Sequence, residues 1–521
     1  MDHPLAPASR YAFAAASGAL LALSFPKFGQ PALAWVALAP LLVALGGGSR
    51  LPERRPIGRS FALGLTAGAV YFAGTLYWIT RVMAMYGGLQ TWVAALVNLA
   101  LIAYLSLFPA IFAMVMGRLL RTQGPGALGV APFVWVATEL GRTHLFTGFP
   151  WVLLGYSQMP VPPIVQLASL GGVFSVSALV AAPAAALAYA ALAGPGPARR
   201  RYGPLACVFA LIGAVAVWGS LRIADGRLTR EGDTVRVGLI QGSADQIERE
   251  NTVQAAGIFD RYLGMSRQAI GQGARLVVWP ESAVPFYFES ERYSADRIRD
   301  LARQSHVSIL FGGDQIEWRV EGARQVAGKY FNSAFMVRPD GSTGGSYRKI
   351  HLVPFGEYVP LKRLFFFAAP LVQAVSDFSP GDAAVLLPVD GHLMSTAICY
   401  EIVYPDLVRR FVTGGSELLS TITNDAWFGA TSAPYQHFAQ AAMRAVEEGR
   451  YLVRAANTGI SGIVDPYGRV LQETPLYQPA MIVGDVRFLH APTVYARIGD
   501  VFAYASVVLT AAVLLLGRRV K

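Results

Sequence analysis

The chain has 521 residues, of which 54% are hydrophobic and only 15% are charged, and its mean hydropathy of +0.41 lies outside the range of ordinary soluble domains. A formal net charge of +11 would suit a nucleic-acid partner, but much of the basic excess lies in short clusters between apolar segments, where anionic lipid is the expected partner. The composition therefore predicts a membrane protein that does not bind nucleic acid.

A helix needs about 20 apolar residues to cross the hydrocarbon core of a bilayer. Candidate segments lie near residues 11–25, 31–47, 61–80, 91–116, 127–141, 164–193, 203–222 and 498–517. The first segment is preceded only by Arg10 and leads to no small-residue cleavage site before a soluble sequence, so we interpret it as a retained span and not as a signal peptide. The sequence therefore predicts a polytopic α-helical membrane protein with eight transmembrane helices.

Basic residues cluster in every second loop between these segments, and short cytoplasmic loops are the ones enriched in Lys and Arg. The clusters are Arg50, Arg54, Arg55 and Arg59; Arg118 and Arg121; Arg199, Arg200 and Arg201; and Arg518, Arg519 and Lys521. Both termini are therefore expected in the cytoplasm, and the long stretch between the seventh and eighth spans is expected outside.

The composition changes to mixed charge between the last two spans, which marks a folded domain of ordinary size. Its apolar runs predict strands at Val235–Ile240, Arg275–Trp279, Val307–Phe311, Phe331–Val337, Leu393–Cys399, Glu417–Thr423 and Ser461–Val464. Helical patterns lie at Glu248–Gln272, Ala295–Gln304, Pro405–Thr413 and Tyr435–Tyr451. This order fits an α/β sandwich with a central mixed sheet. We expect three parts: a seven-helix region at 1–222, an extracytoplasmic catalytic domain at 223–490, and a last span with a cytoplasmic tail at 491–521.

Short connections tie the domain to the spans on both sides, so its chemistry is expected near the bilayer surface. The segment Leu361–Val375 carries Phe365, Phe366 and Phe367 beside two basic residues, a combination that suits a lid or a lipid-contacting loop near headgroups. A buried turn is the alternative interpretation.

Three residues of this domain each end or follow a strand-like run. They are Glu281 in Trp-Pro-Glu-Ser, Lys349 in Tyr-Arg-Lys-Ile-His, and Cys399 in Thr-Ala-Ile-Cys-Tyr-Glu. A cysteine where a strand gives way to a helix can act as a nucleophile, a carboxylate can take its proton, and a lysine can stabilise the charge on an attacked carbonyl oxygen. Taken singly, the cysteine could be a small buried hydrophobe and the Glu–Lys pair a structural ion pair. The combination predicts acyl transfer.

These residues occur in the chain order Glu, Lys, Cys, and with their surrounding motifs the domain resembles the nitrilase, or carbon–nitrogen hydrolase, superfamily. With the spans around it, the whole chain resembles the bacterial apolipoprotein N-acyltransferases. The resemblance implies an α-β-β-α sandwich outside the membrane. It also implies that Glu281 is the general base, that Lys349 stabilises the oxyanion, and that Cys399 is the nucleophile.

Further residues match the family pattern. The resemblance implies that the Tyr400 N–H completes the oxyanion hole and that Glu357 and Glu401 support activity. Trp427 in Asn-Asp-Ala-Trp-Phe-Gly is implied to lie near the site, although core packing explains it almost as well.

In the membrane half, Phe149 and Trp151 belong to a Phe-Thr-Gly-Phe-Pro-Trp motif that the resemblance connects with substrate access or domain docking. An interfacial aromatic belt is the alternative. One departure from the family lies at Glu248–Glu250, where no tryptophan follows Gln241-Gly242-Ser243.

By this resemblance a phospholipid donates an acyl group to Cys399, and the α-amine of a lipoprotein's diacylglyceryl-cysteine accepts it, at the bacterial cytoplasmic (inner) membrane with the catalytic domain on the periplasmic side. We expect no cofactor, no metal ion and a monomer. Two rival hypotheses are a membrane-anchored amidase that hydrolyses a small amide, and a transporter or receptor whose external domain only binds a ligand.

Overall fold

The computed structural model describes residues 6–47, 56–85, 88–244, 252–321, 324–358 and 378–516. The chain divides into two compact units. The helical unit comprises Met1–Thr80, Thr91–Asp225 and Thr493–Lys521, and the sandwich unit comprises Arg81–Gln90 and Gly226–Pro492. Each unit has its own interior.

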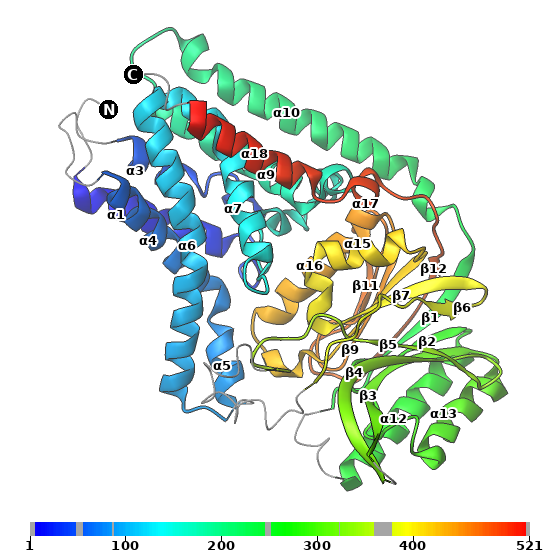
Figure 1. Ribbon diagram of the computed structural model, residues 1–521. Helices are drawn as coiled ribbons and strands as arrows, with labels where there is room; N and C mark the ends of the chain where they lie inside the picture. Colours follow the sequence, from blue (N-terminus) through cyan, green and yellow to red (C-terminus); the bar gives the residue numbers. More distant parts are fainter. Residues whose placement is uncertain are drawn as a thin grey trace. The chain divides into compact units, whose positions relative to one another are not determined.

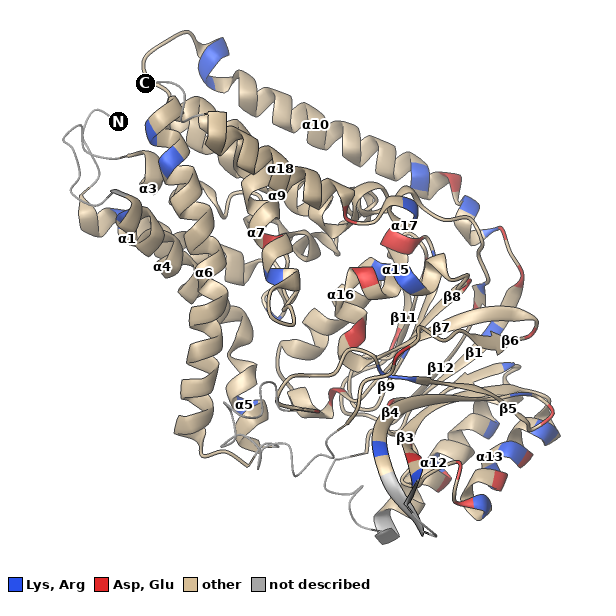
Figure 2. Cartoon of the chain, in the orientation of Figure 1, with Lys and Arg blue, Asp and Glu red and all other residues tan. Residues whose placement is uncertain are grey.

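The helical unit is a bundle in which charged residues are sparse along the helices and gather near their ends (Figures 1 and 2). Its main helices are α1 (Pro7–Leu23), α3 (Ala39–Gly46), α4 (Pro56–Leu76), α6 (Thr91–Gln123), α7 (Ala131–His144), α9 (Ala168–Leu192), α10 (Ala198–Asp225) and α18 (Val501–Leu516). Shorter helices are α2 (Pro31–Ala34), α8 (Pro162–Val165) and α17 (Val494–Ile498), and α5 (Trp78–Met85) continues from α4.

Each predicted apolar segment falls mainly on helix, but not every helix has the length of a span. Among the described residues, three helices are long and apolar enough to cross a membrane: Thr91–His144, Ala168–Leu192 and Ala198–Thr229. The pair Ile57–Leu76 and Trp78–Met85, bent by 51°, makes a fourth if it is one span. Pro31–Gly46 and Val501–Leu516 are shorter apolar helices. The helical unit is thus membrane-like, while the number eight stays a prediction.

Helix α9 carries a break that requires a glycine. Gly172 has a φ of +67° inside the helix, and a Cβ there would lie 2.5 Å from the ring of Tyr495 on α17. Because an L side chain rarely adopts this backbone conformation and would also collide with the ring, only glycine lets α17 pack closely on α9.

The sandwich unit is built from two six-stranded mixed sheets. The first has the order β12-β1-β2-β3-β4-β5 and the second the order β11-β10-β9-β8-β7-β6. The first sheet's strands are β1 (Thr234–Gln241), β2 (Leu276–Val278), β3 (Ser308–Glu321), β4 (Arg324–Val337), β5 (Thr343–Arg348) and β12 (Ala480–Arg487). The second sheet's are β6 (Leu387–Val389), β7 (His392–Ile398), β8 (Leu418–Thr423), β9 (Leu452–Ala456), β10 (Gly462–Val464) and β11 (Val470–Glu473). Parallel pairing joins β1, β2 and β3 in one sheet and β7, β8 and β9 in the other.

The prediction of one central sheet from the strand order is wrong, because the strands divide between two sheets that pack face to face. Helices α12 (Thr252–Gly271) and α13 (Arg292–Ser305) cover the first sheet, and α15 (Pro405–Thr413) and α16 (Ala433–Glu448) cover the second (Figure 1). The four layers are those of the α-β-β-α sandwich that the resemblance implies.

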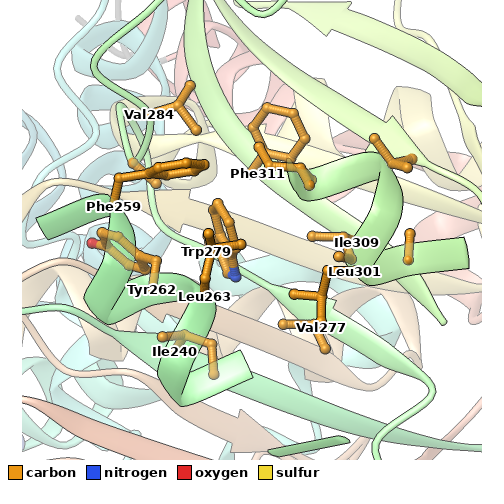
Figure 3. Close-up of a cluster of buried hydrophobic side chains, with 14 of the residues drawn as sticks. Ile240, Phe259, Tyr262, Leu263, Val277, Trp279, Val284, Leu301, Ile309 and Phe311 are labelled. Carbon is orange, nitrogen blue, oxygen red and sulfur yellow. The ribbon is translucent and has the colours of Figure 1, made fainter. Parts of the chain in front are cut away.

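An apolar core fixes the helical layer on the first sheet (Figure 3). The rings of Trp279 and Tyr262 stack at 5.4 Å, and Phe311 packs on the other side of Trp279 at 5.8 Å. The indole Nε1 of Trp279 donates a hydrogen bond to Ser266 Oγ on α12 at 2.8 Å. This core anchors the end of β2 at Val278, three residues before Glu281.

Candidate active site

Glu281 lies just beyond the end of β2 and is only 5% exposed. Its Oε1 accepts a hydrogen bond from Asn332 Nδ2 at 2.7 Å, and its Oε2 accepts one from the backbone N–H of Asn424 at 2.8 Å. Gly312 on β3 makes room for this segment, because a Cβ there would lie 2.6 Å from Cα of Glu281. Since Asn332 is on β4 and Asn424 follows β8, partners from both sheets hold this carboxylate.

Lys349 directly follows β5 and is 1% exposed. Its Nζ donates to Oε1 of Glu357 at 2.8 Å and lies 3.7 Å from Oε1 of Glu281. Burial alone would lower the pKa of Lys349, but the carboxylates of Glu357 and Glu281 raise it above its usual value. Lys349 is therefore a fixed positive charge beside two carboxylates.

Cys399 begins the short helix η5 (Cys399–Val403) directly after β7. Its φ of +52° is left-handed, a conformation that residues other than glycine seldom adopt. Burial raises the pKa of the thiol above its usual range and Glu281 raises it further, whereas Lys349 and a hydrogen bond with Thr423 oppose the shift. The thiol is therefore neutral at rest, and a base must remove its proton when it attacks.

Asn332 connects the two carboxylates of the site. Its Nδ2 donates to Oε1 of Glu281 and, at 3.0 Å, to Oε1 of Glu357, whose other oxygen accepts from the Val353 N–H at 2.7 Å. The sequence analysis missed this residue, although a polar side chain inside the apolar run of β4 is a detectable signal. Glu357 is thus held inside the site by Asn332 and Val353, where it pairs with Lys349.

Glu401 is completely buried and acts on the backbone around the site. Its Oε2 accepts from the N–H of Ile398 at 2.8 Å, and its Oε1 accepts from the N–H groups of Ile350 and His351 at 2.7 and 3.0 Å. The Tyr347 hydroxyl also donates to Oε1. Glu401 therefore links the residue before Cys399 to the segment after Lys349.

A second buried network supports Cys399 from the other side. The ring Nε2 of His437 lies 3.2 Å from the carbonyl oxygen of Cys399, so this nitrogen must carry the proton and donate. Burial, together with Arg454, lowers the pKa of His437, whereas Asp425, whose Oδ1 lies 3.1 Å from the ring Nδ1, opposes the shift. Arg454 NH2 lies 3.0 Å from the same ring nitrogen. Arg454 also binds Asp425 at 2.8 Å. The sequence analysis assigned none of the three a role, although Asp425 lies in the Asn-Asp-Ala-Trp-Phe-Gly motif; no local motif marks His437 or Arg454.

The other predicted site residues are placed as follows. Tyr400 is buried in η5, where its ring packs edge-on against Tyr404 at 5.2 Å. Trp427 is half-buried in η6 (Asp425–Phe428), three residues from the Asn424 N–H that binds Glu281. The ring of His351 packs against Tyr404 at 3.8 Å, and burial lowers the pKa of His351 to about 4.

The remaining candidates lie either in the helical unit or outside the described residues. Phe149 and Trp151 lie in the helical unit, where their rings stack at 6.2 Å and the Trp151 carbonyl accepts from Arg142 at 2.6 Å. The predicted lid residues Phe365, Phe366 and Phe367 and the segment at Glu248–Glu250 lie outside the described residues.

A buried carboxylate, lysine and cysteine at the strand ends of two packed mixed sheets define a nitrilase-type domain. In agreement, the carbon–nitrogen hydrolase family model matches residues 236–489, and the model for the apolipoprotein N-acyltransferase N-terminal domain matches residues 17–186. Among solved structures, an amidase from Nesterenkonia sp. matches with a TM-score of 0.37 and 23% identity, covering 53% of this chain and 97% of that chain.

Curated relatives extend the match over the whole chain. The apolipoprotein N-acyltransferase of Geobacter metallireducens is 41% identical over 529 aligned residues, which cover 100% of this chain and 97% of the relative. That of Brucella melitensis is 34% identical and covers 87% of this chain and 85% of the relative. The chain therefore belongs to the apolipoprotein N-acyltransferase family.

Proposed function

We propose that this protein moves a fatty acyl chain from a phospholipid, through a thioester on Cys399, to the α-amine of the N-terminal diacylglyceryl-cysteine of a lipoprotein. The family supports N-acyl transfer to a lipoprotein, and the phospholipid donor is part of the proposal. One arrangement of buried charges carries the proposal. Lys349 forms ion pairs with both Glu281 and Glu357, and the charges of Glu281 and Lys349 both act on the thiol of Cys399.

In the first step Glu281 takes the thiol proton while Sγ of Cys399 attacks the ester carbonyl carbon. Lys349 and the Tyr400 N–H stabilise the negative oxygen of the tetrahedral intermediate. The intermediate collapses, its C–O bond breaks, and lysophospholipid leaves with the proton from Glu281. Because the pKa of the thiol is raised, proton removal is coupled to attack, and little free thiolate exposes the site to side reactions.

In the second step the α-amine attacks the thioester carbonyl. An α-amino group has a pKa of about 8, so part of it is neutral near pH 7. Glu281 accepts the amine proton as the amide forms, and the C–S bond breaks to return Cys399, which recovers the proton. Water competes for the thioester, so the site must favour the lipid amine by placement and by exclusion of solvent.

The same proposal includes the membrane topology. Eight spans, both termini in the cytoplasm and the sandwich unit on the periplasmic side of the inner membrane would bring Cys399 to the leaflet that holds both lipid substrates, and the protein would act as a monomer. The apolar helices and the basic loops support this arrangement. Labelling of single cysteines with a membrane-impermeant maleimide in spheroplasts tests it, because residues 226–492 should react from outside and the loop at Arg199–Arg201 should not.

Intact-mass analysis tests the chemistry. The protein is incubated with phospholipid alone and then with a diacylated lipopeptide that has a free N-terminus. We expect one acyl chain on Cys399, discharged to the lipopeptide amine. Cys399→Ala should abolish the adduct, whereas Cys207→Ala, which removes the other cysteine, should retain it. Hydrolysis of small soluble amides without any acyl adduct would instead support the anchored amidase.

A further inference from the structure

A group of possible metal ligands lies in the sandwich unit at the far end of β7 from Cys399. His392 begins β7, Glu417 immediately precedes β8, and His490 follows β12. Since β7 ends one residue before Cys399, the group and the nucleophile are separated by the length of this strand, ~20 Å at the usual rise per residue. The group has no part in the proposed acyl transfer.

The ligand atoms are close enough for one ion. One ring nitrogen from each histidine and one oxygen from Glu417 all lie within 4.8 Å of one another. His490 Nε2 lies 3.6 Å from Oε2 of Glu417, and His392 Nδ1 lies 2.5 Å from the same oxygen. Tetrahedral zinc with bonds of about 2.0–2.1 Å keeps its ligand atoms ~3.4 Å apart. The distance from His490 Nε2 to Glu417 already fits this spacing. A shift of the Glu417 carboxylate by about 1 Å would lengthen its distance from His392 Nδ1 to the same value.

The second nitrogen of His392 has the partner that a zinc-bound histidine usually has. Its Nε2 lies 3.2 Å from Oδ2 of Asp233, and its Nδ1 lies 2.5 Å from Oε2 of Glu417. Since a carboxylate only accepts, Nδ1 donates to Glu417 here, and a bound ion would replace that proton while the Nε2–H donates to Asp233. A carboxylate on the distal nitrogen fixes the tautomer and makes the ligating nitrogen more basic. The ring also stacks on Phe488 at 4.1 Å with an interplanar angle of 7°, which limits its rotation.

Backbone hydrogen bonds hold the ligand-bearing segments together. The N–H of Glu417 donates to Leu393 O at 2.8 Å, and the carbonyl of Glu417 accepts from the Leu489 N–H at 3.0 Å. Arg450 further joins the segments by donating to the carbonyls of Ser416 and His490 at 3.0 and 2.9 Å. Each ligand is therefore adjacent to a backbone contact, and little ordering would be required when an ion binds.

The charges at the site suit a divalent cation. Glu417 and Asp233 contribute two negative charges, whereas the guanidinium of Arg450 contributes one positive charge and is directed at carbonyl oxygens. Imidazole nitrogen with carboxylate oxygen is a ligand set that zinc accepts. We propose that His392, Glu417 and His490 bind a structural Zn²⁺ ion, with water in the fourth position and Asp233 holding His392.

This ion would cross-link the two sheets, because His490 continues from β12 of the first sheet while His392 and Glu417 belong to the second. The sequence predicts no metal ion because none of its His, Cys or Asp residues cluster at the short spacings typical of zinc ligands. Here 24 residues separate His392 from Glu417 in the sequence, and His490 lies much further along the chain. Only the pairing of distant strands brings the three together.

The test uses the full chain in detergent, purified without a polyhistidine tag, stripped with chelator and titrated with ZnCl₂ at pH 7.5. Calorimetry should give one site per chain with a Kd in the micromolar range or below. Saturating zinc should raise the unfolding temperature by about 5 °C. Titration with Co²⁺ should give the intense visible bands of a tetrahedral ion.

His490→Gln is the decisive variant, because this side chain is 70% exposed and its loss should leave the fold intact. We expect at least ~10-fold weaker zinc binding and no thermal shift. Glu417→Gln should weaken binding in the same way. The matched control is His306→Asn. His306 is exposed and its backbone is left-handed, a conformation that asparagine tolerates, so this variant should bind zinc like the wild type. Absence of a zinc site in the wild type, or equal affinity in His490→Gln, would overturn the proposal.

Discussion

Lys349 makes its shortest ion pair with Glu357, at 2.8 Å, and not with Glu281, which is 3.7 Å away. The two glutamates therefore have different tasks. Glu357 holds the ammonium group in place and shares its charge, whereas Glu281 keeps a weaker contact with Lys349 that leaves its oxygens able to accept a proton from Cys399.

The first prediction follows from this division. Glu357→Gln removes the charged partner of Lys349, so the ammonium group should lose its fixed position and oxyanion stabilisation should weaken. We expect the rate of Cys399 acylation to fall by roughly 100-fold, the range seen when an oxyanion donor is lost. Single-turnover acylation with phospholipid, followed by intact mass, measures this rate.

The neighbouring ion pair provides the control. Arg348 NH1 binds Glu317 Oε2 at the same distance of 2.8 Å, but Glu317 is 48% exposed. Because exposed pairs contribute little, Glu317→Gln should acylate at the wild-type rate. Equal effects of the two substitutions would show that Glu357 has no special role.

The second prediction concerns the amide shared by Glu281 and Glu357. Asn332→Leu keeps the approximate size of the side chain but removes both hydrogen bonds to the carboxylates. Without these bonds the two carboxylates lose their shared anchor beside Lys349, so the rate of Cys399 acylation should fall by at least ~10-fold. Single-turnover acylation followed by intact mass measures this rate.

A neighbouring substitution separates this effect from simple loss of stability. Ser333→Ala removes a hydroxyl on the next residue of β4, which donates to Gln315 and not to Glu281 or Glu357. It should acylate at the wild-type rate. A loss of rate in Asn332→Leu that only follows a fall in its unfolding temperature would assign Asn332 to packing alone.

The third prediction distinguishes support from chemistry. The buried side chain of Glu401 accepts four hydrogen bonds, three of them from backbone N–H groups. Glu401→Gln turns one acceptor into a donor that faces N–H groups, which should destabilise the sandwich unit by on the order of 3 kcal/mol. Thermal unfolding in detergent should show a clearly lower midpoint. Normal stability with abolished acylation would instead place Glu401 in the chemistry.

The sequence predicts the positions of Glu281 and Cys399, because each residue follows an apolar run whose abrupt end marks the end of a strand. Cys399 and Glu281 lie beyond β7 and β2 as expected. The helix predicted at Pro405–Thr413 is also confirmed with those bounds. These features depend on local patterns of three to ten residues.

What the sequence does not predict depends on pairing between distant segments. Asn332 and the Asp425–His437–Arg454 network are brought together only once two sheets face each other, and β5 and β9 have no distinct apolar run of their own. Single-sequence reasoning also cannot count spans when helices such as α7, with 14 residues, are shorter than the bilayer is thick.

The fourth prediction concerns a buried charge that acyl transfer does not use. Glu448 ends α16 and is 0% exposed. Burial raises its pKa to about 8 and neighbouring Glu447 adds to the shift, although Arg444 and Arg450 oppose it. In the unfolded chain a glutamate loses its proton near pH 4.3. Between these values the folded state holds one proton more than the unfolded state, so stability must fall as pH rises.

Glu448→Gln removes this dependence, because its amide imitates the neutral acid at every pH. We expect the variant and the wild type to have the same free energy of unfolding near pH 5. Near pH 8.5 the free energy of unfolding of the variant should be higher by a few kcal/mol, so it should unfold at a higher temperature. Differential scanning fluorimetry at both pH values measures this margin. The exposed Glu473→Gln serves as the control and should follow the wild type at both. Parallel curves for Glu448→Gln and the wild type would mean that Glu448 is charged in the folded protein across this range, with the nearby arginines outweighing its burial.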